Sequence, residues 1–173
     1  MLKILLGKGD AKKQAADLCA ALSQRAREPV FFASLGVPDT IDGRFDMVVL
    51  HAWLVLERLR ELQMKDVSQA FVNLLFVGFD ESLRDLGVGD IGIGHRVKKM
   101  ADAFYGRLSA YGAATEQGVL KDAIRRNIFR TENGHDSAAA ALSDYVRSAK
   151  AHIADCDLTK QMPDFGPLPV AVS

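Results

Sequence analysis

Apolar residues along this chain recur mostly at spacings of three and four, and few segments alternate with period two. That periodicity is typical of helices that bury one face. It predicts helical segments at about 11–27, 31–36, 45–63, 66–86, 93–112, 116–130 and 136–154, of which 31–36 is a single turn. The prolines at 163, 167 and 169 cannot continue a helix.

We therefore predict an all-α fold, a single-domain helical bundle of about six to seven helices spanning residues 1–173. The core is expected at about 11–155 and an extended C-terminal tail at 156–173. In the segment 45–63, apolar residues occupy nearly every side of the first three turns. A helix that is apolar all round is normally buried on all sides, so we expect this one at the centre of the bundle.

Composition narrows the class of protein. The chain has 173 residues, 49% of them hydrophobic, and only two cysteines. These values fit one compact domain and argue against a disordered chain or a disulfide scaffold. The longest apolar run, 47–56, has about half the roughly 20 residues that a bilayer span needs. With no signal peptide at the N-terminus, we expect an intracellular protein.

The 22 basic and 22 acidic side chains cancel overall but are distributed in blocks. Residues 1–38 carry +3, 39–90 carry −5, 91–130 carry +5 and 131–157 carry −3. The blocks either neutralise one another across the folded surface or present a basic patch to an anionic partner. The second interpretation makes the basic region 96–130 a candidate surface for RNA or lipid headgroups.

Three patterns suggest chemistry, and each has a simpler explanation. Residues 87–92 read Gly-Val-Gly-Asp-Ile-Gly, but a dinucleotide fingerprint needs a preceding strand, and the residues before it favour a helix. His152 and Cys156 are spaced for metal binding, but no second cluster completes a shell. His51 lies in an apolar run, where a buried histidine is more common than a catalytic base. We expect no enzymatic activity, no metal, no cofactor and no small-molecule substrate.

The segment 84–111 carries the strongest non-catalytic signal. A glycine-rich turn leads into a helix whose apolar stripe borders basic side chains. The stripe comprises Val97, Met100, Phe104, Leu108 and Tyr111. Such a helix either packs in the core with a solvated flank or forms a groove for an apolar partner helix. For the second case we predict a partner-binding site that comprises Arg84, Asp90, Arg96, Lys99, Met100, Phe104, Arg107 and Tyr111. Arg84 and Asp90 would fix the geometry of the turn.

Three stretches of the chain resemble the ubiquinol-cytochrome c chaperone family. They are Gly36–Thr40 with Asp42–Asp46, Leu50-His51 with Leu54–Leu59, and Leu86–Asp90 with Val97–Met100 and Phe104–Arg107. The resemblance covers roughly residues 11–155.

The resemblance implies an all-helical assembly chaperone that binds newly made cytochrome b and promotes assembly of ubiquinol-cytochrome c reductase without performing chemistry. The ribosome, a second assembly factor and an anionic membrane surface are left open as further partners. Because the sequence shows no transit peptide, we expect a bacterial, cytoplasmic member that can lie at the inner membrane. The alternative is a peripheral membrane- or RNA-binding adaptor that uses the basic region 96–130.

Overall fold

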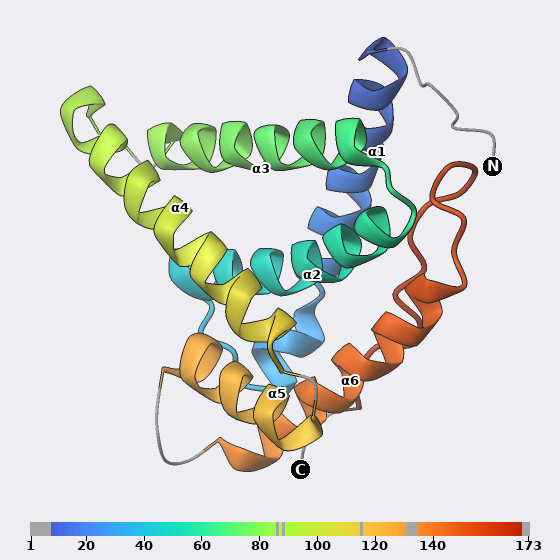
Figure 1. Cartoon of the computed structure of the whole chain (residues 1–173). Coiled ribbons are helices and arrows are strands. Elements are labelled where there is room, and N and C mark those ends of the chain that lie inside the picture. The colour runs from blue at the N-terminus through green and yellow to red at the C-terminus, as the bar shows by residue number, and fades with distance from the viewer. Residues whose placement is uncertain (1–7, 86, 88, 115, 131–134, 171–173) are drawn as a thin grey trace.

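The computed structural model describes residues 8–170 apart from 86, 88, 115 and 131–134, and these residues form an all-helical fold without strands (Figure 1). Six α-helices and two short π-helical turns follow one another along the chain. They are α1 (Lys8–Ala26), η1 (Val30–Ser34), α2 (Ile41–Glu61), α3 (Lys65–Asp85), α4 (Asp90–Gly112), α5 (Gln117–Ile124), η2 (Arg125–Phe129) and α6 (Asp136–Ala154). The predicted all-α class is confirmed, and α3 runs unbroken through Gly78.

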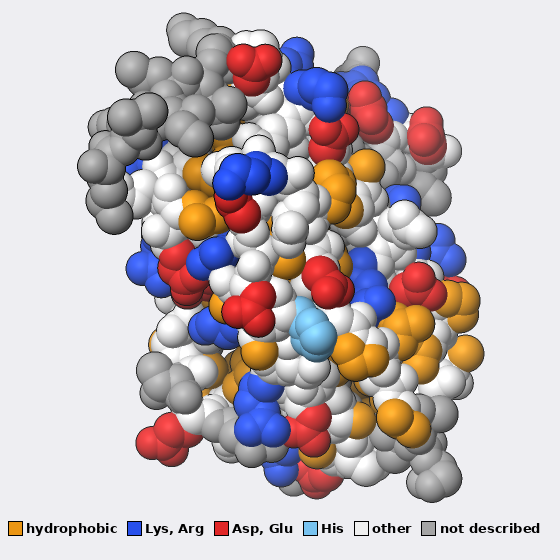
Figure 2. Space-filling view, turned by 90° about the vertical axis from the view of Figure 1, so that its right-hand side faces the viewer, with side chains coloured by type: hydrophobic (Ala, Val, Ile, Leu, Met, Phe, Trp, Pro, Cys, Tyr) orange, Lys and Arg blue, Asp and Glu red, His pale blue; other side chains and the backbone are white. Residues whose placement is uncertain are grey.

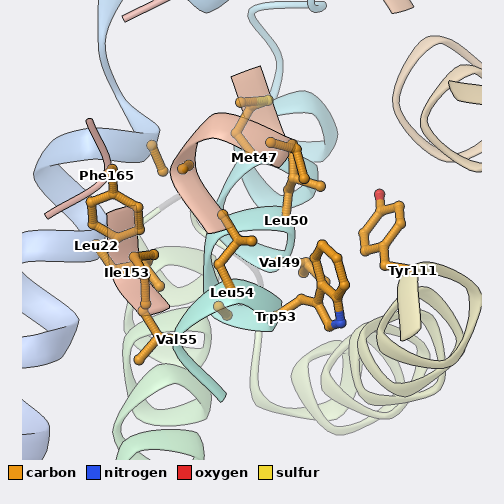
Figure 3. Packing of buried hydrophobic residues seen from close by; sticks show 14 of the residues in the cluster. Leu22, Met47, Val49, Leu50, Trp53, Leu54, Val55, Tyr111, Ile153 and Phe165 are labelled. Carbon is orange, nitrogen blue, oxygen red and sulfur yellow. The ribbon is translucent and has the colours of Figure 1, made fainter. Parts of the chain in front are cut away.

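Helix α2 is the central element, as its apolar pattern predicted. Twelve of its 21 residues are buried, on nearly all sides of the helix (Figure 3). Its start is set locally, because the Thr40 hydroxyl accepts a hydrogen bond from the Gly43 amide at 3.1 Å. Gly43 is needed there, since a Cβ atom would overlap the carbonyl oxygen of Pro38.

The other helices are arranged around α2 (Figure 1). Helix α1 packs against α2 and α3, while α5 and α6 pack against each other on the other side of α2. Helices α3 and α4 form an open V, and α4 crosses α2 on its way to α5. Gly87, with φ of 77°, follows the end of α3 and allows the sharp reversal into α4.

As far as residue 170, the C-terminal tail has no helix after α6 and folds back onto the other helices. Phe165 is buried, with its ring 5.3 Å from that of His51. Arg25 of α1 donates a hydrogen bond to the Gly166 carbonyl at 2.6 Å, and Arg58 of α2 donates to the Cys156 carbonyl at 2.8 Å. The tail therefore closes the core between α1, α2 and α6.

A buried polar chain connects these same three helices. His51 is fully buried, and its ring nitrogens lie 2.7 Å from the Met47 carbonyl oxygen and 2.8 Å from the Tyr145 hydroxyl. Arg25 Nε donates to that hydroxyl at 2.9 Å. Both ring nitrogens of His51 are thus satisfied, which a buried imidazole requires.

We expect Tyr145→Phe to lower the free energy of unfolding by about 1–3 kcal/mol, because it leaves the buried Nε2 of His51 without a partner. Urea titration measures this. The matched control is Tyr105→Phe. Tyr105 is 57% exposed, and its hydroxyl forms no hydrogen bond with the described residues. Equal stability of the two variants would contradict a structural role for the hydrogen bonds that join Arg25, Tyr145 and His51.

Candidate partner-binding groove

The predicted site residues lie on the α3–α4 hairpin, and the structure buries some of their side chains in the core and leaves others at the surface. Phe104 and Tyr111 are both fully buried. Phe104 packs edge-on against Phe76 of α3 at 5.4 Å, and the Tyr111 ring lies 5.7 Å from that of Trp53 (Figure 3). These two side chains hold α4 against α3 and α2, so they do not present a surface to a partner in this conformation.

Arg107 also points inward, toward a fully buried carboxylate of α2. It forms an ion pair with Asp46 at 2.7 Å, and Arg130 contacts the other oxygen of Asp46 at 2.9 Å. Burial raises the pKa of Asp46 to about 6, against the attraction of the two guanidinium groups, which lowers the pKa. Arg130 bonds Asp42 as well, at 2.9 Å. The cluster ties α2, α4 and the end of η2 together.

Arg84, Arg96, Lys99 and Met100 lie at or near the surface. Arg84 is exposed and pairs with Asp80 at 2.8 Å, whereas Arg96 and Lys99 are exposed and lie in no ion pair with the described residues. Met100 is half-buried and packs against the core. Asp90 begins α4. The eight residues therefore share one helical hairpin but do not form one continuous surface.

Ion pairs neutralise much of the basic region 96–130. Arg107, Lys121, Arg125 and Arg130, four of its eight cations, pair with aspartates at 2.7–3.8 Å. On the face that α1, α6 and the tail present, basic and acidic side chains are likewise interspersed (Figure 2). Half of the cations in this region are therefore neutralised by aspartates. The other cations include Arg96 and Lys99, which are exposed on the first half of α4.

A groove of about 630 Å³ opens between α2, α3 and α4, on one side of the V that α3 and α4 form. Leu56, Val72 and Leu108 supply half-buried apolar side chains from the three helices. Tyr105 stands at the edge, stacked on Phe76 with ring centroids 6.4 Å apart. The groove is thus an apolar depression with an aromatic wall.

The other end of the groove, at the α2–α3 turn, is polar and basic. Arg60, Gln63 and Lys65 lie there, and no aspartate or glutamate is among the residues that line the groove. Arg60 pairs with Glu57 at 3.0 Å, whereas Lys65 lies in no ion pair with the described residues. The arrangement can accept an apolar segment that carries a negative charge at one end.

Sequence reasoning found only part of this groove. Leu108 belongs to the predicted apolar stripe of α4, but Tyr105 was not singled out, because periodicity does not tell an exposed aromatic beside a stripe from a buried one. Arg60 and Lys65 were also missed. Their shared position depends on how α2 turns into α3, and local sequence carries no signal of that.

The patterns that suggested chemistry have structural explanations. Because His51 is fully buried, its interpretation as a catalytic base fails. The element before residues 87–92 is helix α3, and not the strand that a dinucleotide site requires. The Cys156 thiol lies 3.4 Å from the His152 carbonyl oxygen, and no three metal-binding side chains converge in the part of the chain that the structure describes.

The fold and groove can be compared with known proteins. Residues 33–160 match the family described as Ubiquinol-cytochrome C chaperone. The chain belongs to this family. The match covers the three resembling stretches and the whole of α2, α3 and α4, so the expected family is confirmed. Membership of a chaperone family implies a role that is not enzymatic.

Two proteins are similar to this chain over most of its length. The crystal structure of the Cbp3 homolog from Brucella abortus is 34% identical, with a TM-score of 0.74 over 86% of this chain and 84% of that one. The Xenopus laevis protein named Ubiquinol-cytochrome-c reductase complex assembly factor 1 is 22% identical over 121 residues. That alignment covers 68% of this chain and spans 60% of the length of the frog protein. Among the described helices, none is long and apolar enough to cross a bilayer.

The burial of His51 predicts a pH-dependent stability. Burial lowers the pKa of His51 from 6.5 to about 4. As the pH falls, the unfolded chain therefore binds a proton on His51 near pH 6.5, whereas the folded chain binds it only near pH 4. The resulting stability is complete above about pH 6.5 and is lost as the pH falls toward 4, by about 3 kcal/mol. We expect the difference in unfolding free energy between wild type and His51→Gln to shrink by this amount between pH 7 and pH 4.

Urea titrations of both proteins at several pH values measure this difference. Asp46 titrates in the same range but is present in both proteins, so its contribution cancels. Between pH 7 and pH 8 the difference should be constant. A difference that stays constant down to pH 4 would show that His51 is not protected from protonation by the fold.

Proposed function

We propose that this chain is an assembly chaperone that binds newly made cytochrome b and promotes the assembly of ubiquinol-cytochrome c reductase. The observation that carries the proposal is the family match over residues 33–160, which includes the helices that form the groove. The frog relative is named as an assembly factor of that complex, which supports the same role here.

The groove supports this proposal on physical grounds. A newly made membrane subunit exposes apolar helices that must be shielded from water before they assemble. Each leucine-sized side chain that is shielded contributes about 1.5–3 kcal/mol. A few such contacts, less the cost of association, suffice for reversible micromolar binding. A chaperone needs no more than this, because it must release its client.

Contact with an anionic membrane surface is a second candidate role, which we infer from the start of α4. Arg96 and Lys99 are exposed there, near the end of the α3–α4 hairpin that projects from the other helices in Figure 1. Cations near a membrane surface contribute about 1 kcal/mol each. Such contact would bring the chaperone to the place where its client inserts. The ribosome or a second assembly factor would be a further partner.

Deletion of the gene tests the leading proposal. We expect the deletion strain to contain less cytochrome b and less assembled reductase, since the unshielded client is lost before assembly. Haem spectra and immunoblots of membranes measure both, and re-expression of residues 1–173 should restore them. Normal reductase in the deletion strain would contradict the proposal.

A liposome assay tests the membrane role separately. We expect the double variant Arg96→Glu/Lys99→Glu to bind phosphatidylglycerol vesicles at least about 30-fold more weakly than wild type, because two attractive charges are lost. The matched control is Lys12→Glu/Arg27→Glu, which changes two exposed cations at or near α1. Wild-type binding should also weaken with added salt. An equal loss in both double variants would exclude a specific role for α4.

A further inference from the structure

We propose that the α2–α3–α4 groove holds an apolar helix of the client, oriented so that an acidic group of that helix lies beside Lys65. This inference rests on the proposed function and assigns the place and the chemistry of client binding. It differs from the surface expected from the sequence, because Tyr105 and Leu108 of α4 take part, whereas Phe104 and Tyr111 serve the core.

The backbone around the groove favours a helical occupant. The lining residues come from α2, α3, α4 and the α2–α3 turn. In that turn the amides of Gln63, Met64 and Lys65 all donate to backbone carbonyls of the chain itself. The groove therefore offers no open strand edge that an extended peptide could join. An occupant must satisfy its own backbone hydrogen bonds, as a helix does.

The side chains of the groove favour an apolar face. Leu56, Val72 and Leu108 converge from three helices and are only partly covered by the chain itself. Tyr105 adds an aromatic ring that is 57% exposed as a residue and is held in place by its stacking on Phe76. A helix that lays leucine-like residues against these four side chains would remove them from water.

The charge of the groove sets the direction of the occupant. Lys65 is the first residue of α3, where the helix dipole disfavours a cation, so fold stability does not explain its presence. An acidic side chain, or the negatively polarised C-terminal end of a bound helix, complements Lys65. The apolar face of that helix then extends toward Tyr105.

A synthetic amphipathic helix tests the assignment. The probe has leucines on one face, a glutamate in its last turn and a free C-terminal carboxylate, and a second probe replaces the glutamate by glutamine and amidates the C-terminus. Fluorescence anisotropy with the full chain measures binding of each. We expect Lys65→Glu to weaken binding of the acidic probe about threefold to tenfold and to weaken binding of the neutral probe distinctly less, because that probe keeps only the helix dipole.

Lys65→Glu is suited to this test because a carboxylate at the first residue of α3 favours the helix dipole, so the fold should persist. The matched control is Lys12→Glu, which makes the same charge change at an exposed site on α1. An equal loss in both variants, or an equal loss for both probes, would overturn the proposed orientation.

Tyr105→Glu tests the apolar wall. We expect it to weaken both probes at least about tenfold, because it places a carboxylate under the apolar face of the bound helix. The control is Val119→Glu, an exposed apolar residue on α5 with 46% of its surface accessible. Unchanged probe binding by folded Tyr105→Glu would overturn the assignment.

The other occupants are distinguishable. If Tyr105→Glu abolished binding to phosphatidylglycerol vesicles and not to the probes, the groove would be a lipid site. If it converted a dimer into a monomer in sedimentation, the groove would join two copies of this chain. Either result overturns the inference. Loss of probe binding together with normal cytochrome b in the deletion strain would keep the groove as a helix site and reject the client.

Discussion

The burial of α2 on nearly all sides is the constraint on which the rest of the structure depends. A helix in that position buries apolar side chains on most of its sides, and a charged or polar side chain buried there is costly unless it finds a partner inside the protein. His51 finds Tyr145 of α6, and Asp46 finds Arg107 of α4 and Arg130 after η2. These contacts fix where α4, α6 and η2 lie relative to α2.

The groove is a consequence of how α4 is held. Phe104, Arg107 and Tyr111 attach one side of α4 to α2 and α3, and this leaves Tyr105 and Leu108 on the neighbouring side. Because α3 diverges from α2 beyond their connecting turn, those two side chains face a space that the chain does not fill (Figure 1). The contacts that stabilise the fold therefore also keep the groove open, and no further element is needed to form it.

The candidate site was predictable as a helix but not as a surface. Spacing of apolar residues correctly predicted a helix at 93–112 with Phe104 and Tyr111 on its apolar stripe. It could not separate core residues from partner-binding residues on that stripe, because both are apolar and both avoid water. Arg107 shows the same limit for charge, since its sequence surroundings gave no sign of Asp46, 61 residues earlier in the chain.

The sequence by itself determined the helical class, the central position of α2, the irregular tail and the family, because these follow from local periodicity, prolines and short motifs. Only the tertiary structure decided which cations are paired, that the tail packs against His51, and that Leu56, Val72 and Tyr105 meet across three helices. Those features depend on distances between residues far apart in the chain. Such distances are set by how whole helices pack, which no local pattern encodes.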